Sequence, residues 1–451
     1  MTRPGHGPAA AESAGARHAR TDAATEADPG TDASSDQGAG QGAGQEAHGV
    51  SGSRGGEAAA RRRALERIDA VAGRLSELSR KLHADPELSF AEHRAADRLA
   101  ELMEEAGFTV RRGPCDLPTA LIASYGSGPL TIGVCAEYDA LPGIGHACGH
   151  NIICAASAGA AIGLAAVADE LGFTVNLLGT PAEEAGGGKV LMLERGGFDG
   201  VTVAMMAHPG PADDVDPRSS TTTVARFAVT FTGRASHAAL APHLGVNAAD
   251  AAVVAQVAVG QLRQQLPDGY RVSGIVRDGG ERSNIIPERT VLEWEVRTPT
   301  AEELTTFRER VTACFRGAAL ATGCAVAIEP TQPDYLDVRN DAWLMARYAD
   351  GLREAAGRSV PEPAGEPRRL GASTDMGNVS HALPAIHPHL GIIGSHGTPH
   401  TREFADWTGG EAADDAVLAA ARAMAWAGIA LATDEERRAH YLALRATGPH
   451  G

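Results

Sequence analysis

The sequence predicts an α/β fold in which a mostly parallel sheet is flanked by helices and a ferredoxin-like α+β domain is inserted into the chain. Three observations lead to this prediction. Short apolar runs alternate with helical segments between about residues 108 and 207, as in a parallel sheet covered on both faces. From about residue 219 the order becomes strand-helix-strand-strand-helix-strand, the order of a small ferredoxin-like sandwich. The first pattern then resumes after residue 335.

The N-terminal segment has the composition of a disordered tail. Residues 1–60 contain no Leu, Ile, Phe, Tyr or Trp, so they cannot bury enough apolar surface to offset their ordering entropy. Order is expected from about residue 61, where apolar residues recur at three- and four-residue spacing through residue 82 and predict an amphipathic helix. The predicted domains are therefore a tail (1–60), a first domain in two parts (61–218 and 336–451) and an insertion (219–335).

The remaining elements follow from the same periodicities. Within the insertion, we expect strands over 223–232, 270–277, 290–297 and 324–329, and helices over 247–262 and 301–321. After it, helices are expected over 342–356 and 410–432, with a Pro-rich loop between them.

Bulk properties exclude some functions. The net charge of -17, without any basic stripe, argues against nucleic-acid binding. The most apolar segment, residues 152–168, is interrupted by glycines and a serine, so no membrane span is expected. The six cysteines have no framework spacing, which favours a reduced, cytoplasmic compartment.

The first chemical motif lies between a strand and a helix. The run 130–136 predicts a buried strand, residues 152–168 predict a buried helix, and the connection carries Cys148 and His150. Ligands bind at such connections in open α/β sheets, and a Cys-x-His pair suits a transition metal. Taken alone, the pair is equally consistent with a buried cysteine beside two incidental histidines.

Two further strands end in polar residues. The strand over 173–180 is followed by Glu183 and Glu184, and the strand over 201–207 is followed by His208. Charged turn residues or a core histidine are the alternative interpretations. Because the ends of successive parallel strands meet at one edge of the sheet, a polar cluster there favours a functional site.

Together these motifs resemble metallopeptidase family M-twenty (M20), which includes aminoacylases, carboxypeptidases and amidohydrolases. The resemblance rests on His-Ala-Cys-Gly-His, Pro-Ala-Glu-Glu, His-Pro, Ser-Asn-Ile-Ile-Pro and a late histidine, and it covers residues 65–435. It is closest to the dipeptidase-like subgroup that includes relatives of β-alanyl-lysine dipeptidase and p-aminobenzoyl-glutamate hydrolase. The resemblance implies two divalent metal ions (Zn, Mn or Co), with Glu183 as the general base. It implies these protein ligands: Cys148 as a bridge, His150, Glu184, His208 and His400.

The insertion carries a second set of family-like residues. Gly233-Arg-Ala-Ser-His237 resembles a lid motif whose histidine reaches the substrate carbonyl, often in the neighbouring subunit. Asn284 and Arg297 match a pair that holds a substrate carboxylate in several relatives. The resemblance thus implies a homodimer formed through the insertion. A strand-end arginine is often only a surface charge, so this role of Arg297 stays open.

Two departures from the family pattern lie at or beside the metal ligands. Many amidohydrolases follow the second histidine of the motif with Asp, where this chain has Asn151, which suits the dipeptidase-like subgroup. Glu137 stands where most of the wider family has a ligand histidine, whereas Asp139 matches an aspartate that orients a ligand.

His396 competes with His400 as the last ligand, and the position just before the closing helix favours His400. His146, His387 and His389 are expected to be structural or rim residues.

We therefore expect a metal-dependent amidohydrolase or dipeptidase acting on a small dipeptide or N-acyl amino acid. The alternatives are a non-catalytic partner subunit of a hetero-oligomeric amidohydrolase and a peptidase acting on longer peptides. A decayed subunit should have lost Glu183 or a ligand, and every matched position is filled, which favours catalysis.

Overall fold

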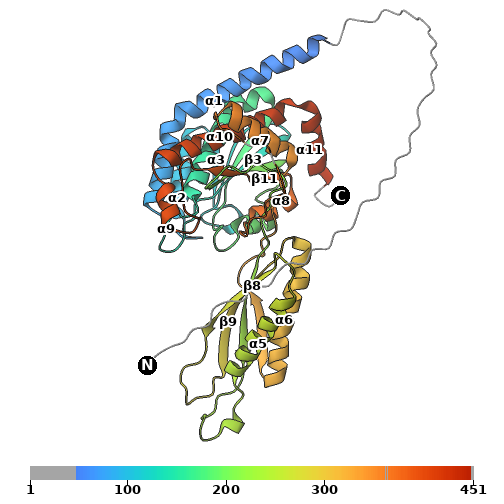
Figure 1. Ribbon diagram of the computed structural model, residues 1–451. Helices are drawn as coiled ribbons and strands as arrows, with labels where there is room; N and C mark the ends of the chain where they lie inside the picture. Colours follow the sequence, from blue (N-terminus) through green and yellow to red (C-terminus); the bar gives the residue numbers. More distant parts are fainter. Residues whose placement is uncertain (1–46, 361, 363, 448–451) are drawn as a thin grey trace, which may run out of the picture. The chain divides into compact units, whose positions relative to one another are not determined.

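The main sheet of the protein has six strands in the order β1-β2-β4-β3-β5-β11. Its strands β3 and β11 are labelled in Figure 1. The computed structural model describes residues 47–360, 362 and 364–447. Strand β3 is parallel to β4 and β5, and β5 is parallel to β11. Only three residues join β2 to β3, too few for a crossover, so β2 runs antiparallel to β4. The strands are β1 (Thr109–Arg112), β2 (Leu121–Gly126), β3 (Leu130–Ala136), β4 (Phe173–Gly179), β5 (Val203–Met205) and β11 (Ala385–Ile386).

Strand β3 lies at the centre of this sheet, and all seven of its residues are buried. Helix α3 packs closely on α10, since a Cβ added at Gly159 would lie 2.9 Å from the Ala421 Cβ. This arrangement confirms the predicted fold class. The helices of this part are α2 (His93–Glu105), α3 (His150–Leu171), α4 (Gly188–Glu194), α7 (Ala342–Glu354), α8 (Met376–Ala382), α9 (Arg402–Trp407), α10 (Glu411–Thr433) and α11 (Glu435–Thr447).

A second, antiparallel sheet has the order β10-β7-β9-β8 and carries two helices. The chain order β7-α5-β8-β9-α6-β10 is the predicted one, and aromatic residues such as Phe227, Trp294 and Phe315 fill its core. The limits of the insertion at residues 219 and 335 remain predictions. The elements are β7 (Ala225–Thr232), α5 (Ala248–Leu262), β8 (Arg271–Asp278), β9 (Arg289–Arg297), α6 (Ala301–Thr322) and β10 (Ala325–Pro330).

A two-stranded parallel sheet brings distant parts of the chain together. It consists of β6 (His208–Gly210) and β12 (His389–Gly391), with His208 directly opposite His389. Residue 208 therefore belongs to a separate short strand rather than to the loop that leaves β5.

The first helix begins earlier than predicted. Helix α1 spans Ala47–Ala84, and Ala60 is fully buried in the core. For residues 47–60 the predicted disorder is therefore wrong; residues 1–46 of the predicted tail lie outside the described residues. Residues 57–60, Glu-Ala-Ala-Ala, are good helix formers, and extending a helix that already exists avoids the cost of nucleation.

Helices α3 and α10 are long and apolar enough to cross a membrane by length and composition alone. However, 89% and 78% of their most apolar windows are buried inside the protein. Such burial is typical of core helices, so the two segments are weak evidence for a membrane span.

Candidate active site

The connection from β3 to α3 places Cys148 and His150 beside β6. Gly149 has a φ of 80°, and a Cβ at this position would lie 2.4 Å from Pro209 Cγ. Only glycine permits both this backbone conformation and this close approach. As a result, the Cys148 Sγ lies 3.5 Å from Nε2 of His208.

Cys148 is shared by two groups of potential metal ligands. Its Sγ lies within 4.8 Å of ligand atoms of His150 and His208, and equally of ligand atoms of Glu184 and His400. Burial, followed by the charge of Glu184, raises the pKa of the Cys148 thiol well above its ordinary value. A thiolate at this position therefore needs cations beside it.

Buried polar atoms without partners support a cation site. Among the described residues, the orphaned atoms include Nε2 of His150, Oε1 of Glu184 and Oε2 of Glu137. Unpaired buried polar atoms are uncommon and unfavourable. Sulfur, imidazole nitrogen and carboxylate oxygen together form a donor set that fits a transition-metal ion.

Asp139 orients two parts of this site. Its Oδ1 accepts a hydrogen bond from Nδ1 of His150 at 2.9 Å, which leaves Nε2 free to face the other donors. Its Oδ2 accepts from the backbone N–H of Glu184 at 3.0 Å. Burial opposes the charged form of Asp139, but the His150 imidazole outweighs it and lowers the pKa of Asp139 to about 2.

The segment after β4 carries the two adjacent glutamates. Ala182 has a φ of 58°, and its N–H donates to the buried Glu92 carboxylate at 2.9 Å. The Tyr335 hydroxyl donates to the carbonyl of Glu183 at 2.7 Å. Burial, and then neighbouring carboxylates, raise the pKa of Glu183 well above its ordinary value, and burial also raises the pKa of Glu184. Nearby divalent cations would lower both pKa values.

His208 is supported from two sides. Its Nδ1 lies 2.8 Å from the carbonyl oxygen of Pro209, so Nε2 is the atom turned towards Cys148. Burial lowers the pKa of His208 to about 4, which keeps the imidazole neutral, as a ligand requires. The rings of His387 and His389 lie 5.4 and 5.6 Å from the His208 ring.

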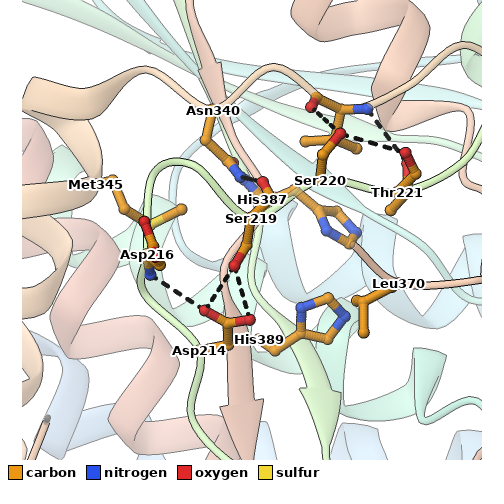
Figure 2. Close-up of a pocket in the computed structure, with 11 residues that line it drawn as sticks. Asp214, Asp216, Ser219, Ser220, Thr221, Asn340, Met345, Leu370, His387 and His389 are labelled. Carbon is orange, nitrogen blue, oxygen red and sulfur yellow. Dashed lines mark hydrogen bonds between the residues drawn. The ribbon is translucent and has the colours of Figure 1, made fainter. Parts of the chain in front are cut away.

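His387 and His389 also border a separate cavity of about 10 Å³, roughly the size of one water molecule (Figure 2). There the Ser219 hydroxyl donates to Asp214, and the backbone N–H of His387 donates to Asn340 at 2.8 Å. Burial lowers the pKa of His389 to about 3 and that of His387 well below its ordinary value. These two neutral rings lie beside the His208 ring and also border the larger cavity at the candidate metal ligands, in keeping with structural or rim residues.

The two candidates for the last ligand lie in different places. His400 Nε2 is 3.4 Å from Oε2 of Glu184, and its backbone N–H donates to Ala147. His396 instead pairs with Glu403, and its side chain is 66% exposed. Of the two histidines, only His400 is among the grouped ligand atoms.

A cavity of about 540 Å³ adjoins the metal donors, and Arg297 lines it together with Glu183 and Glu184. His237 and Asn284 do not line this cavity. Both are exposed on the insertion, where the N–H of Ala238 donates to the Asn284 carbonyl at 3.0 Å. The structure therefore separates Arg297 from the other two residues predicted to contact substrate.

The sequence analysis missed an ionic triad beneath the site. The Lys189 Nζ lies 2.5 Å from Oε1 of Glu137 and 2.6 Å from Oδ1 of Asp375, and all three side chains are fully buried. The Asp375 carboxylate also accepts from the backbone N–H of Lys189. A signal existed in the sequence, since Lys189 is one of two lysines in an arginine-rich chain and directly follows a glycine run.

Comparisons with known proteins agree with this geometry. Residues 220–322 match a family model described as a peptidase dimerisation domain. The chain is 40% identical over 381 residues to the Xaa-Arg dipeptidase of Mus musculus, covering 81% of this chain and 87% of the relative. It is 33% identical to one of the subunits of the p-aminobenzoyl-glutamate hydrolase of Escherichia coli, covering 57% and 58%. Among solved structures, a dinuclear metal-binding M20 peptidase from Bacillus subtilis has a similar fold, with a TM-score of 0.59, 23% identity and coverage of 80% and 99%.

The triad generates a stability prediction. Lys189→Met should lower the free energy of unfolding by about 3–5 kcal/mol, because it leaves two buried carboxylates without their cation. Thermal and urea unfolding of the metal-free protein measure the change. The control is Lys81→Met, which removes the other lysine at an exposed position. Equal stability of the two variants would contradict a compensating role for Lys189.

Proposed function

Because the chain belongs to the M20 family of metal-dependent peptidases and amidohydrolases, we propose that it hydrolyses the amide bond of a small dipeptide or N-acyl amino acid at a two-metal centre. The observation that carries this proposal is the sharing of Cys148 by two groups of ligand atoms. Two cations bound by these groups would share one thiolate, and their charge would hold the thiol deprotonated.

The metal ligands are assigned from the same grouping. His150 and His208 would bind one ion, Glu184 and His400 the other, and Cys148 both. Zinc, manganese and cobalt are the candidate metals, since the mixed sulfur, nitrogen and oxygen donors suit first-row transition ions. Bound there, the ions would lower the pKa of a water molecule and polarise the scissile carbonyl.

Glu183 is the proposed general base. It lies next to a ligand glutamate but belongs to a third group of potential ligand atoms, with Glu137 and His150, and its Oε2 is 3.8 Å from Nε2 of His150. It takes a proton from the attacking water and then gives one to the leaving nitrogen. The hydrogen bond from Tyr335 to its backbone carbonyl holds the segment in place.

A carboxylate on the leaving side is the proposed recognition element. Arg297 lines the cavity and presents a guanidinium, which suits a carboxylate in geometry and charge. The names of the relatives support amide cleavage before a C-terminal amino acid, and the cavity volume suits a dipeptide-sized molecule rather than a long peptide.

The insertion is the proposed homodimer interface. It matches a dimerisation domain, and its helix α5 and edge strand β8 expose apolar side chains. His237 and Asn284 are exposed and lie outside the cavity, so we assign them to the active site of the partner subunit. The exposed apolar residues are Val253, Val254, Val257, Ile275 and Val276.

A non-catalytic subunit is the second candidate, because one relative is named as a subunit of a hydrolase. The filled ligand set and the presence of Glu183 favour catalysis. A cytoplasmic location is also proposed, since all six cysteines are free in the described part of the chain.

Removing the base should separate catalysis from metal binding. Glu183→Gln keeps the size of the side chain but cannot accept a proton, so kcat should fall by about 100-fold or more while the metal stays bound. The assay is dipeptide hydrolysis together with elemental analysis, and Glu194→Gln on α4 is the exposed control. Near-normal turnover of the Glu183 variant would exclude it as the base.

Removing the bridging thiol should release metal. Serine stays protonated and bridges cations poorly, so Cys148→Ser should contain less metal than the wild-type protein after dialysis. Cys154→Ser, which alters a buried thiol of α3 outside the ligand groups, is the matched control. Unchanged metal content in Cys148→Ser would make this residue a core thiol only.

Mixing two inactive chains tests the dimer. In a heterodimer of Glu183→Gln and His237→Ala, one of the two sites would have both groups intact, so about half of the wild-type activity should return per heterodimer. Differently tagged chains allow the heterodimer to be purified before assay. A purified heterodimer without activity would place His237 in its own subunit's site or outside catalysis.

A further inference from the structure

The cavity beside the metal donors has an uneven distribution of charge. Three arginines line it: Arg226, Arg297 and Arg368. Among the described residues, its only acidic lining residues are Glu183 and Glu184, which the proposed function assigns to the base and to a metal ion. Among the described residues, therefore, no carboxylate that lines the cavity remains to bind a positively charged side chain of a substrate.

Arg226 is held in place but incompletely paired. It lies on β7, where its Nε donates to Oε2 of Glu295 at 3.2 Å, and its guanidinium carbon is 5.9 Å from the ring centre of Tyr335. Its Nη1 is buried and has no hydrogen-bond partner among the described residues. The side chain is nevertheless 25% exposed and lines the cavity, so an anion there can contact the guanidinium group.

Arg297 shares the same carboxylate. Its Nε donates to Oε1 of Glu295 at 3.1 Å, and its Nη1 donates to the Ser373 hydroxyl at 2.8 Å. One carboxylate thus lies between two guanidinium groups, so the cluster keeps one uncompensated positive charge. Arg368 adds to it, because its side chain is 58% exposed and approaches Asp214 no closer than 4.0 Å.

Building on the proposed function, we propose that the leaving amino acid of the substrate carries two carboxylates, as glutamate and aspartate do. Arg297 binds the C-terminal carboxylate, and the guanidinium of Arg226 binds the carboxylate of the side chain. A leaving residue with a basic side chain would meet like charges here, which disfavours it. The enzyme then differs in specificity from the relative named for dipeptides ending in arginine.

Matched substrates test this specificity. We would measure kcat/KM of the metal-loaded full-length protein on Ala-Glu, Ala-Gln and Ala-Arg, and on the same three residues carrying a p-aminobenzoyl group. The glutamate compounds should exceed the glutamine compounds by about tenfold or more, because Gln has the same shape without the charge, and the arginine compounds should be the poorest. Cleavage of the Arg or Gln compounds at an equal or higher rate would overturn the inference and leave the proposed function standing. No cleavage in either series would overturn both.

Arg226 variants separate a specificity role from a structural one. Arg226→Gln should lower the Glu-over-Gln ratio of kcat/KM by about tenfold, and Arg226→Lys, which keeps the charge, should restore part of this ratio. Arg112→Gln, at an exposed pair with Asp97, should leave the ratio unchanged. An equal loss on the Glu and Gln compounds in Arg226→Gln would show that the residue acts only through the fold, and would overturn the inference.

Discussion

The compensation of buried negative charge is the constraint on which the site depends. Five carboxylates lie after β3 and β4 and directly before α8, with a Glu184 oxygen within 4.8 Å of the buried Cys148 thiol. Lys189 is the one fully buried ammonium group among the described residues. Lys189 neutralises the Glu137 and Asp375 end of this cluster. The other end, around Cys148 and Glu184, has orphaned polar atoms and needs cations. Lys189 thus compensates the negative charge at one end of the cluster, and bound cations would compensate it at the other. Only the second end leaves donor atoms available for chemistry. The carboxylates are Glu137, Asp139, Glu183, Glu184 and Asp375.

The backbone holds the chemical groups by a small number of directed contacts. Asp139 fixes the tautomer of His150 through one oxygen and the position of Glu184 through the other. The Glu92 carboxylate accepts a hydrogen bond from the N–H of Ala182, and so holds the left-handed backbone directly before the glutamate pair. Each contact joins a buried carboxylate to a strand end, so rigid elements rather than flexible side chains determine the geometry of the site. The short β6–β12 sheet completes the arrangement by placing His208 beside Cys148.

The insertion contributes to the site in two different ways. Arg226 and Arg297 come from neighbouring strands, β7 and β9, and their shared partner Glu295 holds both guanidinium groups at the cavity. His237 and Asn284 belong to the same domain but lie away from that cavity. In the proposed dimer, this domain would provide specificity to its own subunit and complete the site of the other, which would link dimerisation to substrate recognition.

The sequence alone predicted the fold class and the candidate metal donors, because both left local signals in the chain. The spacing of apolar residues was sufficient to predict the main sheet and the β-α-β-β-α-β insertion. Polar residues after successive strands indicated that Cys148, Glu183 and His208 are neighbours. The sequence already favoured His400 over His396, and the structure places His400 beside Glu184 and His396 beside Glu403. Only the tertiary structure brought Lys189 to Glu137 and Asp375, residues that are 52 and 186 positions apart from it in the chain. It also showed that Ala60 is a buried residue of helix α1, although residues 51–64 of the sequence contain no large apolar side chain. Such pairings depend on which distant surfaces come into contact, and no local pattern of residues encodes that.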